Sequence, residues 1–150
     1  MDYLYMGLAS AVSIFFFALS VRSGRKNSIV AGLIGAASYV LYMLLSRRLS
    51  EVGAVFFATL FGCICAETVA RIMKAPATVF SIPIIIPLVP GLMLYRTMLS
   101  FGQGDNSGGV DGAVSTLLVA GSMSLAVTLA TLAARLVTEA QHKHKNKQNG

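Results

Sequence analysis

Residues 78–99 read TVFSIPIIIPLVPGLMLYRTML and contain three of the four prolines of the chain. Arg96 is the one charged residue in this stretch. A helix of about 20 apolar residues is long enough to cross the hydrocarbon core of a bilayer. Each proline inside a helix removes an N–H donor and crowds the carbonyl four residues back. The stretch therefore predicts a membrane-spanning helix that is broken near its middle.

Four other stretches of the chain are similar to this one in length and hydropathy. The 150 residues are 55% hydrophobic and 12% charged, with a mean hydropathy of +0.72. A soluble domain carries about twice that charged fraction, so a soluble enzyme, a disordered chain and a disulfide scaffold are all poor interpretations. Because a backbone in lipid must satisfy its own hydrogen bonds, we expect an all-α integral membrane protein. Its five transmembrane helices would cover residues 4–21, 28–46, 54–70, 78–99 and 113–134.

The basic residues lie mainly between these apolar stretches. Nine of the twelve Lys and Arg fall in the first connector, the third connector and the tail. Basic residues are enriched on the cytoplasmic side of membrane proteins, which predicts the orientation N-out, C-in. The net charge of +6 is thus a topology signal, and no nucleic-acid partner is expected. We expect residues 1–135 to form a single transmembrane domain and residues 136–150 a disordered basic cytoplasmic tail.

The broken helix is the first candidate for a functional site. Prolines at spacings of four and three leave three carbonyls without helical partners on one face, and the glycine after the last proline begins a half-helix with free N–H groups. Many transporters build substrate sites from such broken helices. The alternative is a structural kink or re-entrant hairpin that binds no ligand. The predicted substrate pathway comprises Val79, Pro83, Ile86, Pro87, Pro90 and Gly91 of this stretch, together with Glu67, Tyr95 and Arg96.

Charged and aromatic residues near the helix ends are the second group of candidates. Glu67 lies about one turn from the end of the third stretch, and an ionisable residue at membrane depth is a candidate for function. Arg71 follows four residues later, so an interfacial Glu67–Arg71 ion pair is the competing interpretation. Tyr95 and Arg96 close the fourth stretch, either as interfacial anchors or as contacts for substrate.

The sequence shows no catalytic machinery. It contains no nucleophile paired with a base, no carboxylate pair and no phosphate-binding loop. Cys63 and Cys65 are two residues apart on an expected helix, so their side chains point to different faces. We therefore expect neither an enzyme nor a metal or cofactor site.

The run ETVARIMKAPATVFSIPIIIPLVPG at residues 67–91, with LYRTM at residues 94–98, resembles the threonine/serine exporter family. The similarity is to its small five-helix module, which occurs as the C-terminal half of long exporters or as a separate short subunit. The Pro-x-x-x-Pro-x-x-Pro-Gly core carries most of the specificity. Ile84 departs from the family pattern, in which glycine is frequent, so this break is expected to be stiffer.

The resemblance implies a multi-pass protein of the bacterial inner membrane that exports threonine, serine or related small carboxylates. A split two-subunit form of the family implies C4-dicarboxylates such as succinate as the alternative substrate. A larger subunit with five further helices is the implied partner, a homo-oligomer is also possible, and the proton motive force is the implied energy source. Two other classes stay open, namely a pore-forming small membrane protein and a non-transporting accessory subunit.

Overall fold

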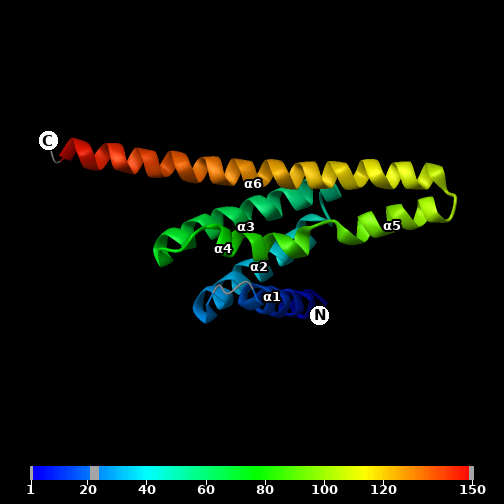
Figure 1. Cartoon of the computed structure of the whole chain (residues 1–150), viewed down its shortest axis with the longest axis horizontal. Helices are drawn as coiled ribbons and strands as arrows, with labels where there is room; N and C mark the ends of the chain where they lie inside the picture. The colour runs from blue at the N-terminus through cyan, green and yellow to red at the C-terminus, as the bar shows by residue number, and fades with distance from the viewer. Residues whose placement is uncertain (1, 21–23, 149–150) are drawn as a thin grey trace.

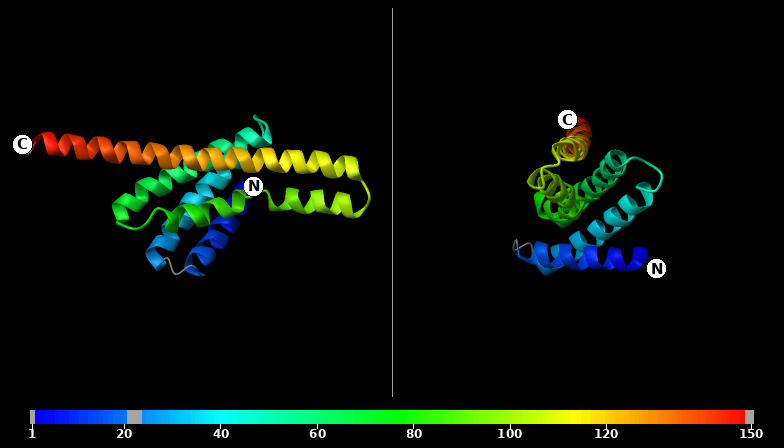
Figure 2. Two further views of the ribbon diagram at one scale, coloured as in Figure 1. Left: turned by 45° about the horizontal axis from the view of Figure 1, so that its top comes forward. Right: turned by 90° about the vertical axis from the view of Figure 1, so that its right-hand side faces the viewer.

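The computed structural model describes residues 2–20 and 24–148, with side chains described for residues 5, 7–20 and 24–137, and all of its elements are helices. The predicted all-α class is therefore confirmed. α1 and α6 lie on opposite sides of the molecule, with α2, α3 and α4 between them (Figures 1 and 2). The elements are α1 (Asp2–Ser20), α2 (Arg25–Leu45), α3 (Glu51–Met73), α4 (Thr78–Ile85), the 3-10 helix η1 (Ile86–Leu88), α5 (Gly91–Gly102) and α6 (Asn106–Gln148).

Three helices are long and apolar enough to cross a membrane, namely α2, α3 and the Asn106–Val137 part of α6. A fourth span forms if Thr78–Leu88 and Gly91–Gly102 are taken together, and these two parts meet at an angle of 44°. The predicted break in the fourth stretch is thus confirmed. The apolar part of α1, Gly7–Ser20, is shorter than the others, so the structure supports three or four of the five expected spans.

α3 runs through the centre of the fold, and local hydrogen bonds cap both of its ends. Ser50 is its N-cap, and its hydroxyl accepts a hydrogen bond from the amide of Gly53 at 3.4 Å. Glu51 in the first turn places negative charge at the positive end of the helix dipole. At the other end Lys74 adopts a left-handed conformation with φ of 52°, and its amide bonds to the last carbonyls of the helix.

Small residues allow α1, α3 and α4 to approach α2 closely. A Cβ added at Gly35 would lie 2.1 Å from Cδ1 of Ile14 on α1. A Cβ at Gly62 on α3 would lie 2.6 Å from Oγ of Ser38 and 2.8 Å from Cγ2 of Ile84. Side chains at these crossings would push the helices apart, because packing between helices in a membrane depends on such close contact.

α6 differs from the sequence expectation at both ends. It begins at Asn106 rather than near residue 113, and it continues to Gln148 through the tail that was expected to be disordered. Asp105 explains the early start, because its carboxylate accepts hydrogen bonds from the Gly108 amide and the Ser107 hydroxyl, both at 3.0 Å. The helix continues as far as Gln148 because no helix-breaking residue interrupts it, since no glycine or proline occurs between Gly121 and the last residue. Residues 149–150 lie outside the described part.

Candidate functional site

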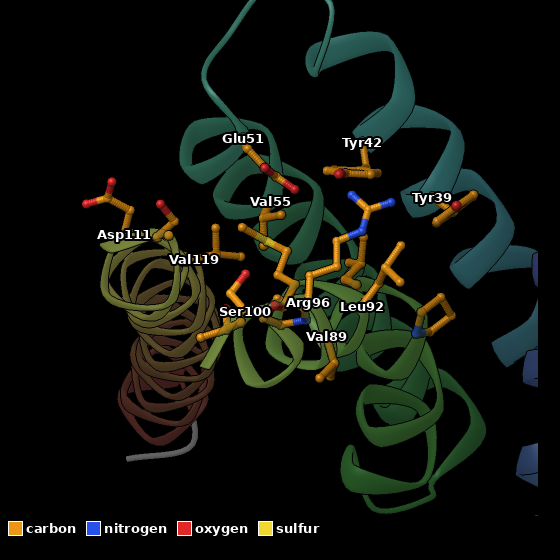
Figure 3. Close-up of a pocket in the computed structure, with 18 residues that line it drawn as sticks. Tyr39, Tyr42, Glu51, Val55, Val89, Leu92, Arg96, Ser100, Asp111 and Val119 are labelled. Atoms are coloured by element: carbon orange, nitrogen blue, oxygen red, sulfur yellow. Dashed lines mark hydrogen bonds between the residues drawn. The ribbon is translucent and has the colours of Figure 1, made fainter. Parts of the chain in front are cut away.

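A cavity of about 580 Å³ lies where the broken helix passes between α2, α3 and α6 (Figure 3). Its walls come from the last two turns of α2, the first two turns of α3, the chain from Pro87 to Ser100 and the first part of α6. The cavity therefore lies toward the end of the molecule at which α2 ends and α3 begins. Three of the predicted pathway residues, Pro87, Pro90 and Arg96, line it.

The break itself spans only a few residues. Pro87 lies in η1, Val89 is extended with φ of −61° and ψ of 131°, and Pro90 is the N-cap of α5. The amide of Val89 donates to the carbonyl of Ile86 at 3.2 Å, and the amide of Gly91 donates to the carbonyl of Val89 at 2.7 Å. The Ile86 carbonyl, which was expected to lack a helical partner because Pro90 has no N–H, accepts a bond of the 3-10 turn in its place.

The first turn of α5 contains backbone amides without a backbone acceptor among the described residues. The first hydrogen bond into this helix runs from the amide of Leu94 to the carbonyl of Pro90, at 3.0 Å. The amides of Leu92 and Met93 precede it, and neither meets a backbone acceptor outside α5 in the described part of the chain. Both residues line the cavity. Free N–H groups at a helix start favour a negative charge, as the sequence analysis expected of this half-helix.

The other predicted pathway residues lie away from the cavity. Pro83 is inside α4 and is almost fully buried, in the same tightly packed region as Ile84 and Phe80. Val79 is half-buried on the same helix, whereas Ile86 and Gly91 are exposed. None of the four lines the cavity. The carbonyls freed by the prolines were expected to share one face toward a ligand, but α4 packs against α1, α2 and α3, and Pro83 is buried in this core.

Three charged residues from three helices line the cavity. Arg96 on α5 directs its guanidinium toward Tyr42, and the carboxylate of Glu51 at the start of α3 points toward the same tyrosine (Figure 3). Asp111 belongs to the cavity wall formed by α6. Among the described residues, neither the Arg96 nor the Asp111 side chain forms a hydrogen bond or an ion pair, and Figure 3 shows the Asp111 carboxylate directed away from Arg96 and Glu51.

Sequence reasoning missed Glu51, Asp111, Tyr39 and Tyr42. Both acidic residues lie between the expected membrane spans, where charged residues are common. One signal was present in the sequence, because Tyr39 and Tyr42 are three residues apart and so share a face of α2. Both tyrosines line the cavity, and their rings lie 6.0 Å apart.

The remaining candidates are separated from the cavity. Glu67 is half-buried on α3, twelve residues beyond the cavity-lining Val55, which is about 18 Å along a helix. The guanidinium of Arg71 donates a hydrogen bond to the carbonyl of Ala134 on α6, and no ion pair with Glu67 forms among the described residues. Tyr95 is 63% exposed and does not line the cavity, unlike its neighbour Arg96.

Comparison with known proteins identifies a matching family. The sequence model of the family described as "Threonine/Serine exporter, ThrE" matches residues 6–133, which is most of the chain. This range contains all the residues that line the cavity. No curated protein and no solved structure matches the chain.

Proposed function

We propose that this chain, which belongs to the threonine/serine exporter family, is the small membrane subunit of a secondary exporter. It would move threonine, serine or related small carboxylates out of the bacterial cell. The observation that carries this proposal is the cavity beside the broken helix, where Arg96 and the free amides of α5 line one wall. Its role is transport of an unchanged solute rather than catalysis.

Arg96 and the start of α5 would hold the carboxylate of the solute. A guanidinium binds a carboxylate through two parallel hydrogen bonds, and the N-terminus of a helix adds favourable dipoles. The break between η1 and α5 supplies the change of direction that brings both groups to the same cavity. Reorientation of α5 at Pro90 would then expose the bound solute to the other side of the membrane.

The chain would span the inner membrane of a bacterium five times, with α1 as the shortest span and the orientation N-out, C-in. The distribution of Lys and Arg between the connectors supports this orientation. The cavity would then open toward the outer face, where the α2–α3 connector lies. Cysteine labelling at Leu49→Cys tests the orientation in intact cells, after Cys63 and Cys65 are replaced by alanine. Labelling by an impermeant reagent supports N-out, and protection from it contradicts this orientation.

A larger subunit with five further helices would complete the transporter. α5 packs mainly against α6 and leaves large apolar side chains exposed, among them Leu92 at 61% and Met98 at 62%. Lipid or a neighbouring subunit, including a second copy of this chain, would cover them.

The proton motive force would drive export, with Glu67 as the proposed proton relay. Glu67→Gln should abolish the response of net export to a pH gradient while leaving solute exchange unchanged, because the residue lies outside the cavity. A retained response would exclude Glu67 as the relay.

The proposed function is tested by counterflow of labelled threonine in membrane vesicles that contain this chain, the larger subunit, or both. Exchange only with both chains supports a two-subunit exporter. Exchange with the larger subunit alone would make this chain an accessory protein. Leakage of a trapped dye from vesicles with this chain alone would indicate a pore instead.

A further inference from the structure

A second hollow of the surface, the α6 groove, lies away from the cavity of the broken helix. Its described lining residues are Val127, Thr128, Thr131, Leu132 and Arg135. We propose that the α6 groove binds one anionic phospholipid, with an acyl chain against its walls and the phosphate held by Arg135 and Arg71. This binding is separate from the proposed export of a solute.

The shape of the α6 groove follows the order of groups in a phospholipid. It has a volume of about 330 Å³ and lies within the apolar Asn106–Val137 part of α6. From Val127 to Arg135 it extends about 12 Å along the helix. Val127 and Leu132 supply apolar walls, and Arg135 lies at the end nearest the tail. An apolar wall that ends at a cation matches an acyl chain that leads to a phosphate.

The two threonines of the α6 groove favour an acyl chain over a polar ligand. The hydroxyl of Thr128 donates to the carbonyl of Ser124 at 2.9 Å. The hydroxyl of Thr131 donates in the same way to the carbonyl of Val127, also at 2.9 Å. Each hydroxyl hydrogen is therefore used within α6, and the described lining offers no hydroxyl donor to a ligand. A hydrocarbon chain needs no such donor.

Two arginines from different helices meet at the end of the α6 groove. The guanidinium of Arg71, in the last turn of α3, donates to the carbonyl of Ala134, the residue before Arg135. Among the described residues, the Arg135 side chain forms no hydrogen bond or ion pair, and Arg71 forms no ion pair with Glu67. Two neighbouring cations repel each other, and a phosphate that contacts both relieves this repulsion through charge-assisted hydrogen bonds.

The charge at this end of the molecule favours an anionic headgroup. The ends of α1 and α3 and the starts of α2 and α4 lie on the same side as the C-terminal part of α6 (Figure 1). Glu67 is the only acidic residue among the side chains described at this end, because the other described acidic residues lie near the starts of α3 and α6. A basic surface next to a membrane attracts anionic lipids. The basic residues described at this end are Arg25, Lys26, Arg71, Lys74 and Arg135.

The test measures lipid binding to the purified full chain in detergent by native mass spectrometry. The probes are phosphatidylglycerol, phosphatidylcholine with the same acyl chains, and glycerol 1-phosphate, which has a phosphate but no acyl chain. Phosphatidylglycerol should bind at least tenfold more tightly than either of the others. Equal binding of phosphatidylcholine would overturn the proposal, because Arg135 would then be an interfacial anchor for any lipid. Equal binding of glycerol 1-phosphate would also overturn it, because the groove would contribute nothing.

Variants locate the site on the chain. Arg135→Gln should weaken phosphatidylglycerol binding about fivefold, whereas Arg135→Lys keeps the charge and should stay within about twofold of the natural protein. Arg48→Gln is the matched control, because it removes the same charge from an exposed arginine in the α2–α3 connector, at the other end of the molecule. It should leave binding unchanged.

An equal loss in Arg48→Gln and Arg135→Gln would show attraction to net charge alone and would overturn the proposal. Unchanged binding in Arg135→Gln, or a loss in Arg135→Lys as large as that in Arg135→Gln, would also overturn it. The measurement involves no transport, so a failure of the proposed export would be seen separately in the counterflow experiment.

Discussion

α4 and α5 come from one apolar stretch of sequence, yet they have opposite environments. Phe80, Pro83 and Ile84 of α4 are almost fully buried between α2 and α3. In α5, Thr97 alone is buried, and Tyr95 and Met98 are more than 60% exposed. Both halves are rich in apolar residues, but α4 has no charged residue whereas α5 carries Arg96.

The difference shows that the break divides a densely packed half, α4, from a sparsely packed half, α5. We call them the fixed part and the adjustable part. α4 touches three other helices, whereas α5 packs principally on α6, where a Cβ at Gly112 would lie 2.6 Å from Oγ1 of Thr97. The cavity lies on the α5 side of the break. The proposed solute site thus lies where packing is sparse, which is usual for parts that must move.

The strongest test of this comparison is truncation of a side chain in each half. Phe80→Ala should lower the free energy of unfolding by about 3 kcal/mol, because Phe80 is fully buried. Leu92→Ala on α5 should change it by less than about 0.5 kcal/mol, because a side chain that is 61% exposed loses few contacts. Unfolding of the purified protein in a denaturing detergent series measures both. Equal losses would show that α5 is as firmly packed as α4.

Removal of the cavity cation should impair transport without affecting the fold. Arg96→Ala should lower threonine exchange at least tenfold, because the carboxylate loses its charged partner, and Arg96→Lys should lower it less. Met98→Ala is the control on the same helix, since Met98 is 62% exposed and does not line the cavity. Counterflow in vesicles with matched protein content measures all three. Unchanged exchange in Arg96→Ala would move the site away from α5.

The two prolines on either side of the break should behave differently. Pro90→Ala should reduce exchange about fivefold, because alanine allows a helical hydrogen bond and straightens the turn that places α5 at the cavity. Pro83→Ala should reduce exchange less than twofold, since this residue lies within α4 and away from the cavity. Membrane insertion should be normal for both variants. A larger effect at Pro83 would contradict the division into fixed and adjustable parts.

The smallest effect is expected at the turn between α5 and α6. Hydrogen bonds from the Gly108 amide and the Ser107 hydroxyl lower the pKa of Asp105 below its usual value. A carboxyl group with a lowered pKa in the folded state stabilises the fold above its unfolded pKa, and this contribution is lost as the pH falls through the folded value. Asp105→Ala should therefore slightly lower the thermal stability at pH 7, and the difference from the natural protein should vanish in acid. A difference that is independent of pH would show that the carboxylate charge is not involved.

The position of the break could be predicted from sequence, because the effect of Pro87 and Pro90 on a helix is local. The location of Pro83 could not, since its burial depends on where α4 crosses α2 and α3. Glu67 was predicted from its membrane depth, whereas the acidic residues of the cavity, Glu51 and Asp111, lie in the first two turns of α3 and α6. Their relation to Arg96 exists only in the folded chain, so no spacing rule could have identified them.

α6 continues without interruption for 43 residues, about 64 Å, which is roughly twice the thickness of the hydrocarbon core. Figure 1 shows its C-terminal part extending past every other helix. Gly112 and Val119 form cavity wall near one end, while the lysine-rich segment 143–147 lies near the other. Because the helix is continuous, a small tilt at the cavity end would displace the far end by a larger distance. Occupancy of the cavity would be readable as displacement at that distant tip.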